Sequence, residues 1–193
     1  FKHFIYRKDE DFRQALYNLS SYRAKQEIFF RATGLLGISA HITETWLSDC
    51  GHEATCKLLT PPGYCMKSFP RPTRGGGIAV IYRQSLEPYL AFKQTVSYQH
   101  STFEVVEVVI SGSGACTCVC VYRPPPSPKN KFTFSAFLIE IEELFDHHNT
   151  HTPEFVLLGD FNIHFDQPHN NDTKQIRDAL DCHGFKQLVD QPT

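Results

Sequence analysis

The sequence predicts a layered α/β (α+β) sandwich. Short apolar runs with strand-like patterns, bounded by clear turn signals, are interleaved with a few amphipathic helical segments. The chain has 193 residues, of which 41% are hydrophobic, and this is enough for one domain with a sizeable core. A Rossmann sheet is disfavoured, because the phosphate-binding pattern Gly-x-Gly-x-x-Gly is absent from the sequence.

The first half of the chain predicts three strands and one helix. We expect a strand at about 14–20, a helix at 22–33 that ends near Gly34, and a second strand at 35–43. A loop rich in Pro and Gly follows at 60–64. Three consecutive glycines then lead into the strongly strand-like run 78–82.

The second half predicts a hairpin, two helices and a buried strand. The runs 103–110 and 116–122 are separated by a Ser/Gly-rich turn and are typical of an antiparallel hairpin. Segments 132–148 and 173–183 have the periodicity of amphipathic helices. Between them, the four apolar residues 155–158 predict a buried strand.

The end of that buried strand is the strongest candidate for chemistry. Gly159 interrupts the strand, so that Asp160 and Asn162 emerge where strand meets loop. A carboxylate and an amide at this place stand on a rigid scaffold and still reach solvent and ligand. The alternative is an Asx-type turn that merely closes the strand.

The cysteines favour buried free thiols over a metal site. None of the seven forms a Cys-x-x-Cys pair. Cys116, Cys118 and Cys120 alternate along a predicted strand and would share one face as a buried stripe. We expect these three to be reduced, as in a reducing compartment, with no bridge to Cys50, Cys56 or Cys65.

Charge and hydropathy restrict the setting of the protein. A net charge of -2 argues against a generally basic nucleic-acid coat, although Arg71, Arg74 and Arg83 could still meet a phosphate backbone. No run approaches the roughly 20 apolar residues of a membrane span. The N-terminus is too charged for a secretory signal. We therefore expect an intracellular protein, nuclear or cytoplasmic, without membrane contact.

Four short islands complete the pattern. They are TETWL at 43–47, RGGGIAVIY at 74–82, VYRPP at 121–125 and GDFNIH at 159–164. In this order and spacing the chain resembles the endonuclease domain of LINE-type non-LTR retrotransposons, a branch of the endonuclease/exonuclease/phosphatase family. The resemblance covers 15–193 and leaves 1–14 as an N-terminal extension. It implies a DNase-I-like four-layer sandwich, in which two β-sheets pack face to face with helices outside.

The resemblance also implies a metal site. Glu44 follows an apolar run and corresponds to the principal ligand for Mg²⁺, with Mn²⁺ as a possible substitute. Mg²⁺ typically takes one or two protein carboxylates and fills its shell with water and substrate phosphate. Without the resemblance, a solvated side chain or an N-cap partner is the simpler interpretation of Glu44. Asn18 corresponds to a second metal-site residue that orients the phosphate, although its surroundings depart from the family pattern.

Catalytic roles are carried over in the same way. Asp160 would align or deprotonate water, Asn162 would donate to a phosphate oxygen, and Tyr122 would contact the phosphate or the leaving oxygen. The alternative for Tyr122 is an aromatic that packs across strands. We expect Asn18, Glu44, Tyr122, Asp160 and Asn162 to converge, with the Glu44 and Asp160 carboxylates within roughly 10 Å of each other.

Three further residues are expected to bind substrate, namely Arg123, His164 and Thr193. The simpler interpretations are a solvated loop charge for Arg123 and polar surface for His164. In the family, a Ser-Asp-His island near the C-terminus and a further upstream Asp complete the active site. The present sequence stops at 187–193, which resembles the segment just before that island, so the last strands and these groups are expected to be missing.

The implied activity is Mg²⁺-dependent phosphodiester hydrolysis that nicks target DNA to prime reverse transcription. DNA is the expected partner, together with a reverse transcriptase domain in the full-length element. Loss of the C-terminal Asp-His is expected to cripple this activity. Two alternatives remain, a catalytically inactive remnant that binds DNA or protein, and a phosphatase acting on a small phosphoester.

Overall fold

The computed structural model describes residues 3–6, 38–47, 53–71, 76–94, 101–112, 116–151 and 155–187. The strand and helix expected at 14–33 lie outside these ranges, as do Asn18, Cys50, Arg74 and Thr193.

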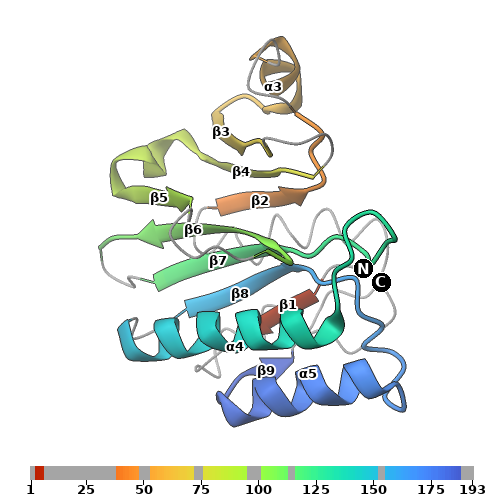
Figure 1. Ribbon diagram of the computed structural model, residues 1–193. Helices are drawn as coiled ribbons and strands as arrows, with labels where there is room; N and C mark the ends of the chain where they lie inside the picture. Colours follow the sequence, from red (N-terminus) through yellow and green to blue (C-terminus); the bar gives the residue numbers. More distant parts are fainter. Residues whose placement is uncertain are drawn as a thin grey trace.

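A six-stranded sheet forms the centre of the fold, with strand order β5-β6-β7-β8-β1-β9 (Figure 1). Its strands are β1 (His3–Tyr6), β5 (Leu90–Gln94), β6 (Glu104–Ile110), β7 (Cys116–Tyr122), β8 (Phe155–Asp160) and β9 (Lys186–Gln187). Strands β7 and β8 run parallel, and the other pairs are antiparallel. Both faces of β6 and β7 are largely buried, which explains why these strands are apolar almost throughout.

The second sheet has three antiparallel strands in the order β2-β4-β3. They are β2 (Ile38–Thr43), β3 (Tyr64–Phe69) and β4 (Ile78–Arg83), and the central strand β4 is buried except at its last residue. A 3₁₀ turn, η1 (Gln84–Tyr89), connects β4 to β5 in the larger sheet. The short helix α3 (Glu53–Leu59) lies beyond β3, on the side away from the larger sheet (Figure 1).

Two apolar cores hold these layers together. The first lies between the sheets and combines Val80 and Tyr82 of β4 with Val106, Val108 and Cys120 of the larger sheet. The second lies between the larger sheet and two helices, α4 (Phe134–His151) and α5 (Asn171–Cys182). Phe residues dominate this second core. The predicted arrangement of two packed sheets flanked by helices is therefore confirmed.

The predicted hairpin is also confirmed, since β6 and β7 pair antiparallel from Glu104–Tyr122 to Ile110–Cys116. Strand β1 lies within the predicted N-terminal extension and pairs with both β8 and β9. The division of the chain at residue 14 stays a prediction. Within the described residues, no helix has the length and apolar character that a membrane span requires.

The predicted stripe of thiols lies between the two sheets. Cys118 and Cys120 are buried there, and Cys116 packs against the same core. Hydrogen bonding with Cys116 and burial raise the pKa of the Cys118 thiol well above its usual value. These three cysteines are free, as are Cys56 and Cys65, in agreement with the prediction.

His41 makes folding sensitive to acid. It lies opposite Val80 in the β2–β4 ladder and is buried, and this burial lowers its pKa from 6.5 to about 4. The unfolded chain binds the proton more strongly, so the stabilisation is present above pH 6.5 and is lost as the pH falls towards 4. We expect the free energy of unfolding to drop by about 3 kcal/mol over this range, at about 1.4 kcal/mol per pKa unit.

Urea unfolding followed by circular dichroism at several pH values measures this loss. His41→Leu should flatten the pH dependence, whereas replacing the exposed His169 by glutamine should leave it unchanged. Equal pH dependence in the wild type and in His41→Leu would show that His41 is not the group responsible.

Candidate functional site

The candidate site lies where β2, β7 and β8 end. Because β7 and β8 are parallel, their final residues Tyr122 and Asp160 stand opposite each other at the same edge of the larger sheet. Strand β2 of the smaller sheet ends at Thr43, one residue before Glu44. Residues distant in sequence thus meet at the boundary between the two sheets.

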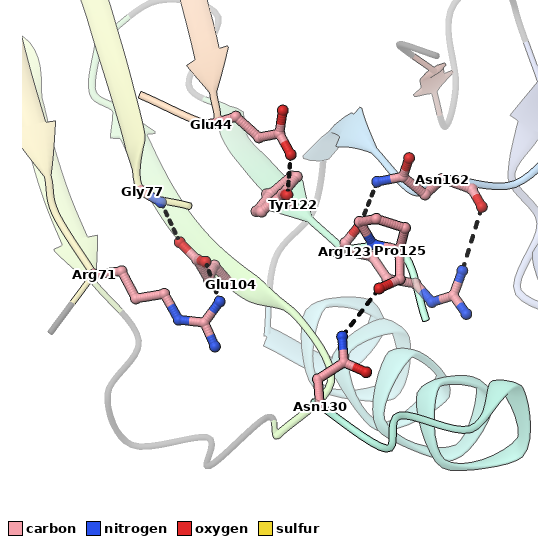
Figure 2. A network of polar contacts seen from close by, with 9 residues as sticks. All are labelled: Glu44, Arg71, Gly77, Glu104, Tyr122, Arg123, Pro125, Asn130 and Asn162. Atoms are coloured by element: carbon pink, nitrogen blue, oxygen red, sulfur yellow. Dashed lines mark hydrogen bonds and ion pairs between the residues drawn. The ribbon is translucent and has the colours of Figure 1, made fainter. Parts of the chain in front are cut away.

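Glu44 and Tyr122 connect the two sheets directly. The Tyr122 hydroxyl donates a hydrogen bond to the Glu44 carboxylate (Figure 2). Glu44 is exposed and has a left-handed backbone conformation with φ 55°, which is uncommon for residues other than glycine. Tyr122 is almost fully buried and also packs in the core between the sheets. The Tyr122 ring therefore packs in the core, while its hydroxyl makes a polar contact with Glu44.

Asp160 and Asn162 form a tight loop directly after β8. The Asn162 backbone N–H donates to Asp160 Oδ1 at 3.0 Å, which is the Asx turn that the sequence offered as the alternative interpretation. The Asn162 side-chain amide donates to the carbonyl of Arg123 at 2.6 Å, and the Arg123 N–H donates to the carbonyl of Asp160 at 2.8 Å. These bonds fix the ends of β7 and β8 to each other.

Arg123 is placed differently from the sequence prediction. It is only 3% exposed, and its guanidinium donates to the carbonyl of Phe161 at 3.0 Å. The same guanidinium donates to the carbonyl of Asn162 at 3.5 Å (Figure 2). The guanidinium also lies 4.6 Å from the centre of the Phe137 ring. Burial lowers the pKa of this guanidinium. Neither direct substrate contact nor a solvated loop charge fits this burial, and we assign Arg123 a positioning role.

Arg123→Met tests that role. Methionine keeps the length and the apolar contact with α4 but removes the donors to the loop carbonyls, so we expect a loss of about 1–3 kcal/mol in unfolding free energy. Urea denaturation measures the loss. The exposed Arg83 provides the matched control, because Arg83→Met should cost little. Equal stabilities of the two variants would contradict a positioning role for Arg123.

Sequence reasoning missed Glu104 as a member of the site. Glu104 is the first residue of β6 and stands directly opposite Tyr122 in the β6–β7 ladder. Its carboxylate accepts a hydrogen bond from the Gly77 N–H at 2.8 Å and lies 3.4 Å from the Arg71 guanidinium (Figure 2). The available signal was a charged residue at the start of an otherwise apolar strand.

The hydrogen bond between Gly77 and Glu104 supports the backbone that follows Glu44. The carbonyl of Gly77 accepts a hydrogen bond from the Thr45 N–H at 3.2 Å, and the carbonyl of Gly76 accepts one from the Trp46 N–H at 2.9 Å. Gly76 has φ +74°, and a Cβ there would lie 2.3 Å from a Glu104 carboxylate oxygen. The positive φ favours glycine at this position, and any side chain there would displace the Glu104 carboxylate from the turn.

Negative charge gathers around the Tyr122 phenol. Burial raises the pKa of Tyr122 well above 10, and the hydrogen bond to Glu44 and the charges of Glu44, Glu104 and Asp160 raise it further. Burial and the charge of Glu44 likewise raise the pKa of Glu104, although the Gly77 N–H and Arg71 oppose this shift. The phenol therefore stays protonated and remains a hydrogen-bond donor at neutral pH.

The donor set fits a hard divalent cation. Within the described residues, no group of three or more His, Cys, Asp or Glu side chains has the arrangement of a protein-only metal site. Mg²⁺ does not need one, because it is usually held by one or two carboxylates together with water and phosphate. Glu44 is exposed enough to offer its carboxylate, and the neighbouring negative charges favour a cation there.

The remaining predicted residues contribute less to this site. His164 is exposed, and its ring lies 3.8 Å from the Asp166 carboxylate. The structure thus brings together Glu44, Tyr122, Asp160 and Asn162. The roles of Asn18 and Thr193, which lie outside the described residues, stay predictions.

Comparison with known proteins gives one family match. The profile described as "Endonuclease/Exonuclease/phosphatase family" matches residues 14–191. No curated protein matches the chain significantly.

Two solved structures show a distant likeness. The 3′ phosphatase NExo from Neisseria, bound to a product DNA hairpin, is 18% identical with a TM-score of 0.43, over 73% of this chain and 59% of that chain. The endonuclease domain of TRAS1, a telomere-specific non-LTR retrotransposon, is 17% identical with a TM-score of 0.43, over 64% of this chain and 54% of that chain. The match thus spans little more than half the length of either structure.

Proposed function

The chain belongs to the endonuclease/exonuclease/phosphatase family, and from this premise we propose that it hydrolyses phosphodiester bonds in DNA with Mg²⁺ or Mn²⁺ as cofactor. The observation that carries the proposal is the meeting of Glu44, Tyr122 and Asp160 at one edge, where the Tyr122 hydroxyl donates to Glu44. A phosphodiester bound there would have a protonated phenol and two carboxylates beside it.

Each side chain has a distinct task in this proposal. Asp160 aligns and deprotonates the attacking water, and its fixed position in the loop reduces the cost of orienting that water. Asn162 donates to a phosphate oxygen. Tyr122 has one O–H, which would turn from Glu44 to the phosphate or to the leaving oxygen when substrate binds, and its raised pKa keeps that proton on the hydroxyl. Glu44 would hold the divalent cation. When bound, the cation would neutralise the negative charge that develops on the phosphate.

We assign the reaction more narrowly to nicking of target DNA in a retroelement. The support is the set of sequence islands TETWL and VYRPP at 43–47 and 121–125, which resemble those of LINE-type endonuclease domains. In that setting, the 3′ hydroxyl at the nick primes reverse transcription. The further partner would be a reverse transcriptase domain of the same element.

The substrate class is tested by offering DNA and small phosphoesters in parallel. We expect the chain to relax supercoiled plasmid in the presence of Mg²⁺, at the strongly reduced rate expected above, and to stop when the metal is chelated. Inositol phosphates and p-nitrophenyl phosphate should be turned over much more slowly. Faster hydrolysis of the small esters would identify a phosphatase instead. DNA binding without turnover of any substrate would identify an inactive remnant of the fold.

A further inference from the structure

Trp46 is the only tryptophan of the chain, and 61% of its surface is exposed two residues after Glu44. Single exposed apolar side chains are common on proteins and need no special explanation. Trp46 differs from such ordinary exposed side chains in its left-handed backbone conformation and in its position two residues after Glu44. Only two other large hydrophobic side chains within the described residues are comparably exposed, Tyr89 and Ile139, and both belong to other elements.

The backbone at Trp46 has an uncommon conformation that the fold holds in place. Trp46 has φ 54°, a left-handed conformation that is rare for a bulky side chain and strains the backbone. The conformation is held by the hydrogen bond from the Trp46 N–H to the carbonyl of Gly76. The next residue, Leu47, is buried and anchors the segment on its other side. The fold therefore maintains a strained backbone at Trp46, and its exposed indole belongs to the residue two positions after Glu44.

The charge of the site explains why a neutral contact is useful there. Phosphate contacts by Lys and Arg normally supply most of the affinity for DNA. Here the chain carries a net charge of -2, and three carboxylates surround the Tyr122 phenol. A polyanion gains little from this electrostatic environment. An indole can instead stack on the face of any nucleobase, without a charge and without sequence preference.

Stacking also restricts the form of the DNA. Bases in an intact duplex are already stacked on their neighbours, so a free base face exists only where a base is unpaired, displaced or at a strand end. On the basis of the function proposed above, we infer that Trp46 stacks on an unpaired or displaced base next to the scissile phosphate. Trp46 would thereby direct the enzyme to single-stranded or distorted DNA at the site of the nick.

Because Trp46 is the sole tryptophan, its fluorescence reports the contact directly. We expect saturable quenching when the metal-free protein is titrated with a single-stranded oligonucleotide, or with a duplex carrying unpaired bases. Quenching by a fully paired duplex of the same sequence should be weaker. Anisotropy of labelled oligonucleotides measures binding independently of the tryptophan.

Variants separate stacking from a structural role. Trp46→Ala should weaken binding of the unpaired oligonucleotide about 5- to 100-fold, the range typical of one base–aromatic stack, and Trp46→Phe should restore part of it. The ratio of Kd values between Trp46→Ala and wild type should change little with salt, because no ion pair is involved. Ile139→Ala, which removes an equally exposed apolar side chain on α4, should bind like the wild type.

Unchanged emission at an oligonucleotide concentration that saturates the anisotropy signal would overturn the inference, as would wild-type affinity of Trp46→Ala. These measurements need no turnover, so they separate the stack from the proposed reaction. Plasmid nicking without quenching would refute the stack alone. Quenching without nicking would refute the reaction alone. Absence of both oligonucleotide binding and plasmid nicking would refute both.

Discussion

Replacing Glu44 by glutamine is expected to lower the affinity for Mn²⁺ or Mg²⁺ at least about tenfold and to slow DNA nicking about 10²- to 10³-fold. Glutamine preserves the shape of the side chain and can still accept the hydrogen bond from Tyr122, so the connection between the sheets should survive. Only the negative charge is removed. Mn²⁺ binding followed by electron paramagnetic resonance measures the first effect, and plasmid relaxation measures the second.

The exposed Glu143 on α4 provides the control for that experiment, since Glu143→Gln removes the same charge from another surface. Its cation affinity and its nicking rate should match those of the wild type. If Glu44→Gln binds Mn²⁺ as tightly as the wild type, Glu44 is not the principal ligand.

Alanine at position 159 is expected to destabilise the fold by about 3 kcal/mol or more. Gly159 stands opposite Val121 in the β7–β8 ladder, and a Cβ at Gly159 would lie 2.0 Å from the Val121 carbonyl oxygen. This neighbour is backbone within a sheet and cannot rotate away, so β7 and β8 would have to separate. Asp160 follows immediately, and the separation would also disturb its alignment with Tyr122. Thermal and urea unfolding measure the loss.

Gly112 provides the comparison for this substitution. It has φ +115°, but nothing lies within 4 Å of the position its Cβ would take. Gly112→Ala should therefore cost only the backbone strain, about 1–2 kcal/mol. Similar losses for the two variants would mean that the close approach of β8 to β7 is not what requires glycine at 159.

The parts of the fold that the sequence predicted are those with strong apolar runs. Strand β4 and the β6–β7 hairpin are buried over nearly their whole length, so their composition alone identifies them. Strands β3 and β5 escaped prediction because both lie at sheet edges and mix polar with apolar residues. Helix α3 has only seven residues, too few for a clear helical period.

The candidate site was predictable in part for a similar reason. Glu44, Tyr122 and Asp160 follow or end apolar runs, where polar residues stand out. The resemblance, and not the spacing, suggested that they meet. The contact of Glu44 with Tyr122 depends on the packing of one sheet on the other, which no local pattern encodes. Glu104 was missed because its role arises from tertiary contacts with Gly77 and Arg71.

Arg123 was expected at the surface, as a substrate contact or a solvated charge, but it is buried. Three prolines follow it in the sequence, and this context suggested an exposed loop. In the structure, Phe134 and Phe137 of α4 cover the guanidinium, and the carbonyl of Phe161 accepts its hydrogen bond. All three residues belong to other segments of the chain, so burial of the charge could not be predicted from its sequence neighbours.

The most direct test of the account is the rate of plasmid nicking in Asp160→Ala, in Glu44→Gln and in the variant that carries both changes. If the two carboxylates serve one catalytic centre, each single variant loses most of the Mg²⁺-dependent rate, and the double variant is hardly slower than the worse of the two, because groups that act as a unit are not additive. Nicking by Asp160→Ala at the wild-type rate would contradict the account, since the reaction would then not depend on the centre formed by Glu44, Tyr122 and Asp160.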